Sequence, residues 1–245
     1  MEPLWLAVTL LALAGLSLFA YTVRALDAVG AAASFLLGLL VALLGGLGWL
    51  MLMVLFTALG VAATRLGFRS KQRRRVAEGN EGERGLRNVL ANGGASTLAA
   101  LALPLGSWIP ERAATLAFAT AVAAVTADTL ASEIGALARR ARRILPPFQA
   151  VQAGTNGAVS VLGQFAALGG AVAIAWAAVP LADIPRSLVW VPALAGFLGC
   201  QFDSLLGATL ERDLLRDGPL SKEDVNFIAS AVPAFVVLIT ATLAV

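Results

Sequence analysis

Apolar stretches of about twenty residues, separated by short polar segments, follow one another along the whole chain. Each stretch is long enough to cross the hydrocarbon core of a bilayer as an α-helix, whose backbone polar groups are satisfied internally. The second and third stretches are nearly continuous, and we divide them at Gly45-Gly46-Leu47-Gly48, a tight-turn sequence. The pattern predicts eight helices, at about residues 3–23, 28–45, 48–65, 86–105, 112–138, 155–180, 187–210 and 224–244.

These helices predict the fold class, an all-α polytopic membrane protein with a single integral-membrane domain over residues 1–245. Composition agrees, since 59% of the residues are hydrophobic and 13% are charged, against about 25% charged in soluble domains. The chain has no histidine, which excludes catalysis or metal binding by imidazole. A single cysteine, Cys200, excludes an intramolecular disulfide. The first stretch lacks a basic n-region and a cleavage site, so we expect a retained helix.

Basic residues are concentrated on alternate loops. The loops at 24–27, 65–87, 139–153 and 211–223 hold 16 of the 18 lysines and arginines, and only Arg112 and Arg186 lie on the opposite side. The positive-inside rule therefore predicts that these four loops are cytoplasmic, that both termini lie outside, and that the protein belongs to the inner cell membrane. No basic stripe is interleaved with aromatic residues, so we expect no nucleic-acid partner.

Five short polar motifs each border an apolar stretch on the side of the basic loops, within a core of about residues 66–245. Carboxylates and amides are costly at membrane depth, so Asp128, Glu133 and Asp203 need partners, water or a ligand. Polar groups gathered at one membrane face are typical of an active site. The motifs are GERGLRNVLANGG (82–94), ADTLASEIG (127–135), GTNGAVS (154–160), QFDSLLGATLE (201–211) and SKEDVNF (221–227).

The three carboxylates predict a Mg²⁺ site. Carboxylates with hydroxyls and amides, without His or Cys, are ligands for hard cations, and Asp203 and Ser204 add such groups from a second helix. Asp128 and Glu133 lie about 140° apart around a helix axis, so they offer oxygens to two adjacent interfaces. The alternative is that each carboxylate pairs with a loop arginine near the membrane surface.

Glycines and asparagines predict phosphate binding. We expect Asn92-Gly93-Gly94, Asn156-Gly157 and Asn226 at helix starts, where free N–H groups and the helix dipole favour phosphate oxygens. The alternative is plain N-capping, which needs no ligand. Arg84 and Arg87 open the first motif helix and would bind phosphate bidentately. The cluster at 69–75 is instead expected to set topology and contact anionic lipids.

Together the five motifs resemble the integral-membrane family that includes plant phytyl-phosphate kinase and an animal transmembrane protein. The resemblance covers roughly residues 30–245 and keeps the order of all five motifs. It implies conversion of an isoprenyl monophosphate to its diphosphate, with CTP as the expected donor. Two departures, Glu211 where Gln is common and Ala158 where Gly is common, remove no proposed ligand. The residues carried over are Arg84, Arg87, Asn92, Asp128, Glu133, Asn156, Asp203, Lys222 and Asn226.

The motifs and this resemblance together predict a Mg²⁺-dependent phosphotransferase at the cytoplasmic side of the bilayer. The resemblance implies that its substrate is phytyl or geranylgeranyl phosphate. The acceptor is already an ionised phosphate, so no general base is required. Asp128, Glu133 and Asp203 would bind Mg²⁺, while Arg84, Lys222 and the helix starts would bind phosphates. One alternative is an ion-coupled transporter, suggested by a weak repeat of the hairpins that follow Asp128 and Asp203. Another is a lipid-binding membrane protein without catalysis.

Overall fold

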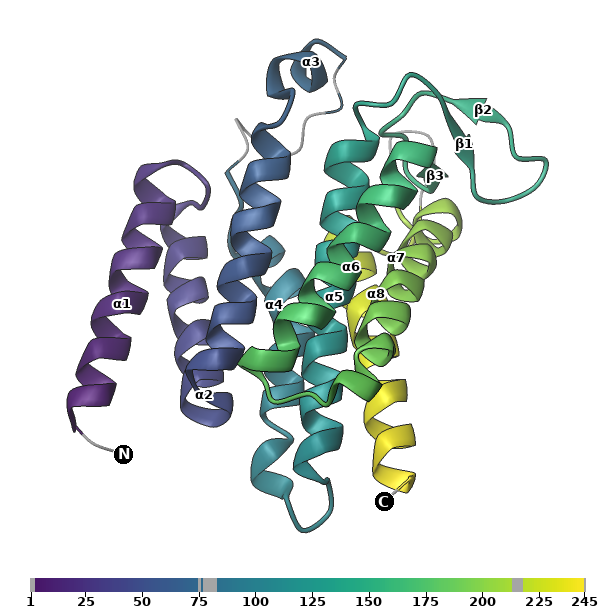
Figure 1. Ribbon diagram of the computed structural model, residues 1–245. Coiled ribbons are helices and arrows are strands. Elements are labelled where there is room, and N and C mark those ends of the chain that lie inside the picture. Colours follow the sequence, from purple (N-terminus) through teal and green to yellow (C-terminus); the bar gives the residue numbers. More distant parts are fainter. Residues whose placement is uncertain (1–2, 75, 77–82, 213–217, 245) are drawn as a thin grey trace.

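The computed structural model describes residues 3–74, 76, 83–212 and 218–244, and these form a helical bundle with a small sheet at one end (Figure 1). Arg75, Gly82 and Arg216, which entered the sequence predictions, lie outside the described residues. The long helices are α1 (Pro3–Thr22), α2 (Ala28–Arg65), α4 (Leu86–Ala100), α5 (Glu111–Gly135), α6 (Val161–Leu181), α7 (Trp190–Thr209) and α8 (Lys222–Leu243). The short elements are α3 (Phe68–Arg73), η1 (Leu103–Leu105), β1 (Ala141–Arg143), β2 (Ala150–Val151), β3 (Ala158–Val159) and η2 (Arg186–Leu188).

Helix α2 is two antiparallel helices joined at Gly46 (Figure 1). Gly46 has φ 80° and ψ −178°, a conformation that glycine adopts without steric cost. Nearby, Gly48 packs directly against the backbone of Leu181 at the end of α6, where a Cβ atom would not fit. The predicted division of residues 28–65 into two spans is therefore confirmed.

Six described helices are long and apolar enough to cross a membrane, and the 38-residue α2 counts as one of them although Gly46 divides it. Helix α4 is shorter than predicted, because it ends at Ala100 and the 3-10 turn that contains Pro104 follows. The predicted all-α, polytopic membrane architecture is confirmed.

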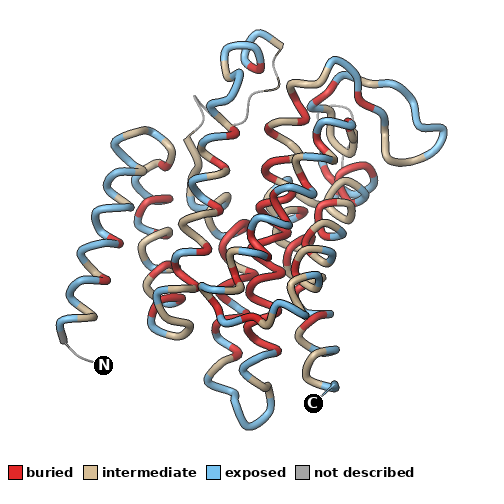
Figure 2. Tube along the Cα trace, viewed as in Figure 1, coloured by how far each residue is buried: buried red, intermediate tan, exposed pale blue. Residues whose placement is uncertain are grey.

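Helix α5 is the central helix of the bundle. Some 89% of its apolar stretch is buried, against 11–39% for the other five candidate spans, and Figure 2 shows it almost wholly buried. It is rich in alanine and threonine, and such small residues let neighbouring helices approach closely. Gly196 of α7, for example, lies against Ala123 of α5. The two acids near the end of α5 are thus carried by the most constrained helix in the protein.

Residues 141–159 form a small sheet that the hydropathy pattern did not predict. Its order is β2-β1-β3, both pairings are antiparallel, and Arg142 pairs with Ala150 on one side and Val159 on the other. Helix α6 consequently begins at Val161 rather than near residue 155. Ser160 caps this helix, because its hydroxyl accepts a hydrogen bond from the Gly163 amide.

One end of the bundle carries α3 and the sheet, and the two chain ends lie at the other (Figure 1). The described parts of all five polar motifs border the first end, which we call the polar end. This is the one-sided arrangement expected from alternating spans.

A candidate active site at the polar end

A cavity of about 650 Å³ opens at the polar end, between α4, α5, α7, α8 and the loop from β2 to β3. All five polar motifs contribute to its lining, although they are far apart in the sequence. It collects most of the predicted site residues, but not Asn92 or Gly93. Those that line it are Arg84, Arg87, Asp128, Glu133, Asn156, Gly157, Asp203, Ser204, Lys222 and Asn226.

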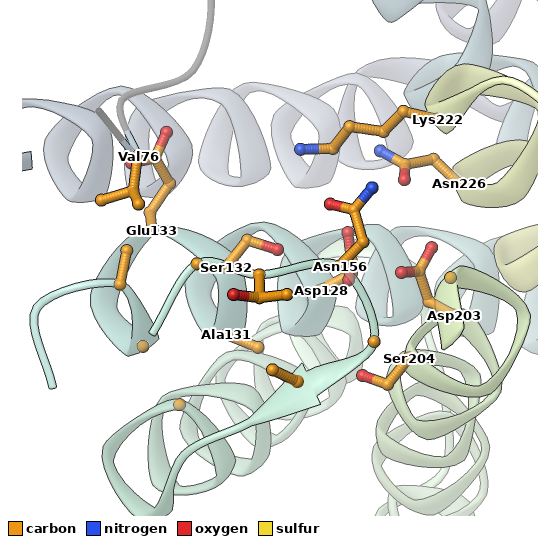
Figure 3. A pocket seen from close by; sticks show the side chains of 18 of the residues that line it. Val76, Asp128, Ala131, Ser132, Glu133, Asn156, Asp203, Ser204, Lys222 and Asn226 are labelled. Carbon is orange, nitrogen blue, oxygen red and sulfur yellow. The ribbon is translucent and has the colours of Figure 1, made fainter. Parts of the chain in front are cut away.

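Asp128 of α5 and Asp203 of α7 lie side by side in this cavity, close enough for their carboxyl groups to hydrogen-bond (Figure 3). Two carboxylates at this separation repel each other unless they share a proton or a cation. The Asn226 amide, turned so that its nitrogen faces acceptors, donates to Asp203 Oδ2 at 3.2 Å and to the Lys222 carbonyl at 3.1 Å. This pair of acids is therefore held from three helices.

Three cationic side chains line the same cavity. Lys222 extends into it from the start of α8 and interacts electrostatically with Asp203 (Figure 3). Arg84 donates to the Thr64 hydroxyl at 3.2 Å, and Arg87 is exposed on the first turn of α4. Cations facing an acid pair provide a site for anions such as phosphates together with a metal ion.

Glu133 does not join the two aspartates, which corrects the predicted set of three metal ligands. It is 3% exposed, and its carboxylate accepts hydrogen bonds from Thr64 at 2.7 Å and Lys71 at 2.5 Å. Five residues turn a helix by about 140° from Asp128, so Glu133 faces α2 and α3 rather than α7. Among the described residues, no group of three acidic or sulfur side chains could hold a metal ion.

The sequence suggested that Lys71 and Arg74 belong to a solvated basic cluster, and the structure shows that they do not. Lys71 is 1% exposed and donates to Glu133 and to the Ala63 carbonyl. Arg74 donates to the Ala136 carbonyl at 2.9 Å and the Ala138 carbonyl at 3.1 Å, beyond the last turn of α5. The hydropathy pattern could not reveal this, because all their neighbours from 69 to 74 are polar as well.

The Asn156-Gly157 pair lies in the loop before β3, not at a helix start. Asn156 Nδ2 donates to Glu211 Oε1 at 2.8 Å, and Gly157, at φ 66°, lies directly against Ala208 of α7. Glu211 is 6% exposed and lines the cavity, so it is a site residue that the sequence reasoning missed. The signal was available, because Glu211 is a carboxylate at the end of the fourth polar motif, beside an apolar stretch where it needs a partner.

The other two predicted helix starts are also wrong. Asn92 lies in the second turn of α4, where its amide donates to the Asn88 carbonyl at 2.8 Å. Gly93 packs against Leu37 of α2 and does not line the cavity. Asn226 lies in the second turn of α8, which Ser221 caps. The first turns of both helices are made of residues from the polar motifs. The apolar part of each helix therefore begins later than the helix itself.

Comparison with known proteins identifies the family. Residues 11–234 match the family described as Integral membrane protein DUF92. The chain belongs to this family. The match to DUF92 contains all five polar motifs, so the cavity is built from residues within the family region, and the family resemblance seen in the motifs is confirmed.

Three relatives show the range of this DUF92 likeness. An uncharacterized membrane protein of Methanocaldococcus jannaschii is 34% identical over 241 residues, which are 97% of this chain and 95% of that protein. An uncharacterized membrane protein of Synechocystis is 31% identical over 73% of this chain and 69% of its own length. Protein VTE6, chloroplastic, of Arabidopsis thaliana is 29% identical over 77% of this chain and 57% of its own length. No solved structure matches the chain.

Proposed function

We propose that this protein transfers a phosphoryl group from a nucleoside triphosphate, CTP first among them, to an isoprenyl monophosphate in the membrane. The observation that carries the proposal is the acid pair Asp128 and Asp203 facing Lys222, Arg84 and Arg87 in one cavity at a membrane end. The likeness to VTE6 and the resemblance of the motifs to the phytyl-phosphate kinase family support an isoprenyl phosphate as acceptor.

The acid pair fits a Mg²⁺ ion. In nucleotide sites Mg²⁺ takes one or two protein carboxylates and fills its other positions with water and substrate phosphates. Asp128 and Asp203 provide such a pair, and their closeness favours a shared cation over two free charges. When bound there, Mg²⁺ would neutralise phosphate charge that the cationic side chains leave uncompensated.

The reaction needs no general base from the protein. A phosphate oxygen of the isoprenyl monophosphate attacks the γ-phosphorus, and the bond from that phosphorus to the β-phosphate oxygen breaks. The leaving nucleoside diphosphate keeps the electron pair, and the total charge of the products equals that of the reactants. The work of the protein is to hold two anions in line against their mutual repulsion.

The cavity residues divide this work between them. Arg84 and Arg87 at the start of α4 and Lys222 at the start of α8 would bind phosphate oxygens. Asn156 and Ser204 would orient the two phosphates by hydrogen bonds, and Glu211 holds the Asn156 amide in place. Such fixed contacts cost no reorganisation when the phosphoryl group moves.

We place the protein in the inner cell membrane, with the cavity at the cytoplasmic face where nucleotides are available. The support is the charge asymmetry of the sequence, since the four loops expected at that face hold 16 of the 18 basic residues. The position of the cavity favours an enzyme over an ion-coupled transporter, because alternating access needs its binding site near the middle of the bilayer.

Label transfer tests the proposal. Purified protein is incubated with CTP labelled in its γ-phosphate, Mg²⁺ and geranylgeranyl phosphate, and the lipid fraction is analysed for labelled diphosphate. The matched control for Asp128→Asn and Asp203→Asn is Asp183→Asn, which alters an exposed carboxylate at the opposite end of the bundle. Failure of the wild type to label any isoprenyl phosphate from any common nucleoside triphosphate would refute it.

A further inference from the structure

A second cavity of about 790 Å³ adjoins the polar one. It lies between α6, Phe197 of α7 and the strands β1 and β2, and we call it the side groove. Its volume lies within the range of about 300–1,000 Å³ that is usual for ligand pockets. Ala141, Val159, Ser160 and Gln164 line both cavities, so the two spaces meet at the start of α6.

One face of α6 forms the floor of the side groove. Val161, Gln164, Phe165 and Leu168 follow the spacing that places residues on the same side of a helix. Gln164, the polar member of this face, stands at the junction with the polar cavity, and the apolar members lead away from it. Phe165 is 71% exposed, so the groove opens sideways at the surface that faces lipid.

Three arginines line the end of the groove that lies beside the sheet. Arg139 and Arg140 follow α5, and Arg142 belongs to β1, and all three are exposed. Guanidinium groups at this position attract anionic headgroups from the membrane surface and bind phosphate oxygens. The groove therefore combines a cationic end with an apolar wall, which matches the chemistry of a lipid phosphate.

We propose that the side groove binds the hydrocarbon chain of the lipid phosphate while the phosphate lies in the polar cavity. This inference rests on the proposed function. It adds the place where the lipid substrate enters and the residue that limits the length of its chain. The proposal is supported by the junction of the two cavities at Gln164 and Ser160, because a lipid chain in the side groove would direct its headgroup toward the acid pair. The three arginines draw the anion toward that junction. Leu168, one turn beyond Phe165, then limits the length of chain that fits.

Chain-length preference tests this inference. The full-length protein is assayed with isoprenyl monophosphates from geranyl to geranylgeranyl phosphate, and kcat/KM is measured for each. Leu168→Trp fills the groove, so we expect a loss about tenfold larger for geranylgeranyl than for geranyl phosphate. Leu162→Trp is the matched control, because Leu162 is 45% exposed against 46% for Leu168 and does not line the groove.

Leu168→Ala is a second test, which keeps the inference testable if Leu168→Trp does not fold. It enlarges the groove and is expected to shift the preference toward longer chains. Wild-type ratios of kcat/KM in Leu168→Trp and Leu168→Ala, in a protein that does label isoprenyl phosphates, would overturn the groove while leaving the proposed function intact.

Photolabelling tests lipid binding in the side groove separately from the proposed phosphoryl transfer, in case no transfer is found. The probe is geranylgeranyl phosphate with a diazirine at the far end of its chain. Labelling of α6 near Leu168 that geranylgeranyl phosphate displaces and phosphatidylglycerol does not would support the groove even without the proposed activity. Equal displacement by phosphatidylglycerol, or labels spread over all lipid-facing helices, would show that bilayer lipid fills the groove and would overturn the inference.

Discussion

The ammonium nitrogen of Lys71 lies 2.5 Å from Oε2 of Glu133, and the two side chains are 1% and 2% exposed. The pair joins α3 to the last turns of α5, beside the cavity. Arg84 Nη2 lies 3.8 Å from the other carboxylate oxygen, so the same glutamate also holds an arginine that lines the cavity. Glu133 therefore positions Arg84, one of the cationic residues that line the cavity.

Removing the charge of Glu133 is expected to destabilise the protein. Glu133→Gln leaves the Lys71 ammonium buried without a counter-ion, which costs about 3–5 kcal/mol when one member of such a pair is lost. The expected result is a lower thermal unfolding midpoint in detergent, with reduced activity as a consequence. The double variant Lys71→Met/Glu133→Leu should recover much of the stability, because an apolar pair of similar size replaces the ions. An unchanged midpoint for Glu133→Gln would contradict this prediction.

Asp128→Asn and Asp203→Asn are expected to abolish phosphoryl transfer and leave folding intact. Each change keeps the side-chain volume but removes a carboxylate from the proposed Mg²⁺ site. The measurements are label transfer and the binding of Mn²⁺, as a Mg²⁺ substitute, in the presence of CTP. Both should fail in these variants while the unfolding midpoint stays near that of the wild type. Near-normal rates in either variant would reassign that aspartate to a structural role.

Arg87 and Arg74 should respond to alanine substitution in different ways. Arg87 lines the cavity, so Arg87→Ala should cost about 1.5–3 kcal/mol of transition-state binding, or roughly tenfold to hundredfold in kcat/KM. Arg74→Ala removes two hydrogen bonds at the end of α5 and should lower the unfolding midpoint more than kcat/KM. Arg112→Ala, at the opposite end of the bundle, is the control. Equal kinetic losses at Arg87 and Arg74 would mean that the start of α4 is structural.

The orientation in the membrane can be measured with single cysteines. In a Cys200→Ala background, Gln72→Cys on α3 should resist a membrane-impermeant maleimide in intact cells. Trp108→Cys, at a residue that is 82% exposed near the opposite end, should react. The reason is the concentration of basic residues on the side of the polar end. Labelling of Gln72→Cys from outside would reverse the topology and place the cavity away from cytoplasmic nucleotides.

The membrane spans were predictable because they depend on local hydrophobicity and on turn residues such as Gly46. The gathering of the motifs at one end followed, since successive spans reverse direction. Side-chain partners were not predictable in the same way. Lys71 and Glu133 are 62 residues apart, and whether a lysine is buried depends on which helix packs above it. The helix starts expected at Asn92 and Asn226 failed because polar residues that belong to a helix give no apolar signal. The one expected at Asn156 failed because that residue lies in the loop before β3.

The sheet at 141–159 also escaped prediction, and for a different reason. Its strands contain two or three residues each, too few for an alternating pattern to be visible. Yet this sheet carries Arg142 and places Asn156 over the cavity. The sequence could therefore name most of the side chains in the candidate site, but not the backbone element that brings one of them there.

The turn at Gly46 bears on how the protein enters the membrane. No charged residue lies between Asp27 and Arg65, so nothing in α2 anchors the turn in water on the far side. The two halves are expected to insert as one hairpin from the side on which both ends lie, with the backbone of Gly46 carried across the bilayer. Insertion would then require that the chain is synthesised as far as residue 65. The first half of the hairpin alone would end on the far side of the membrane, without the second half that returns the chain.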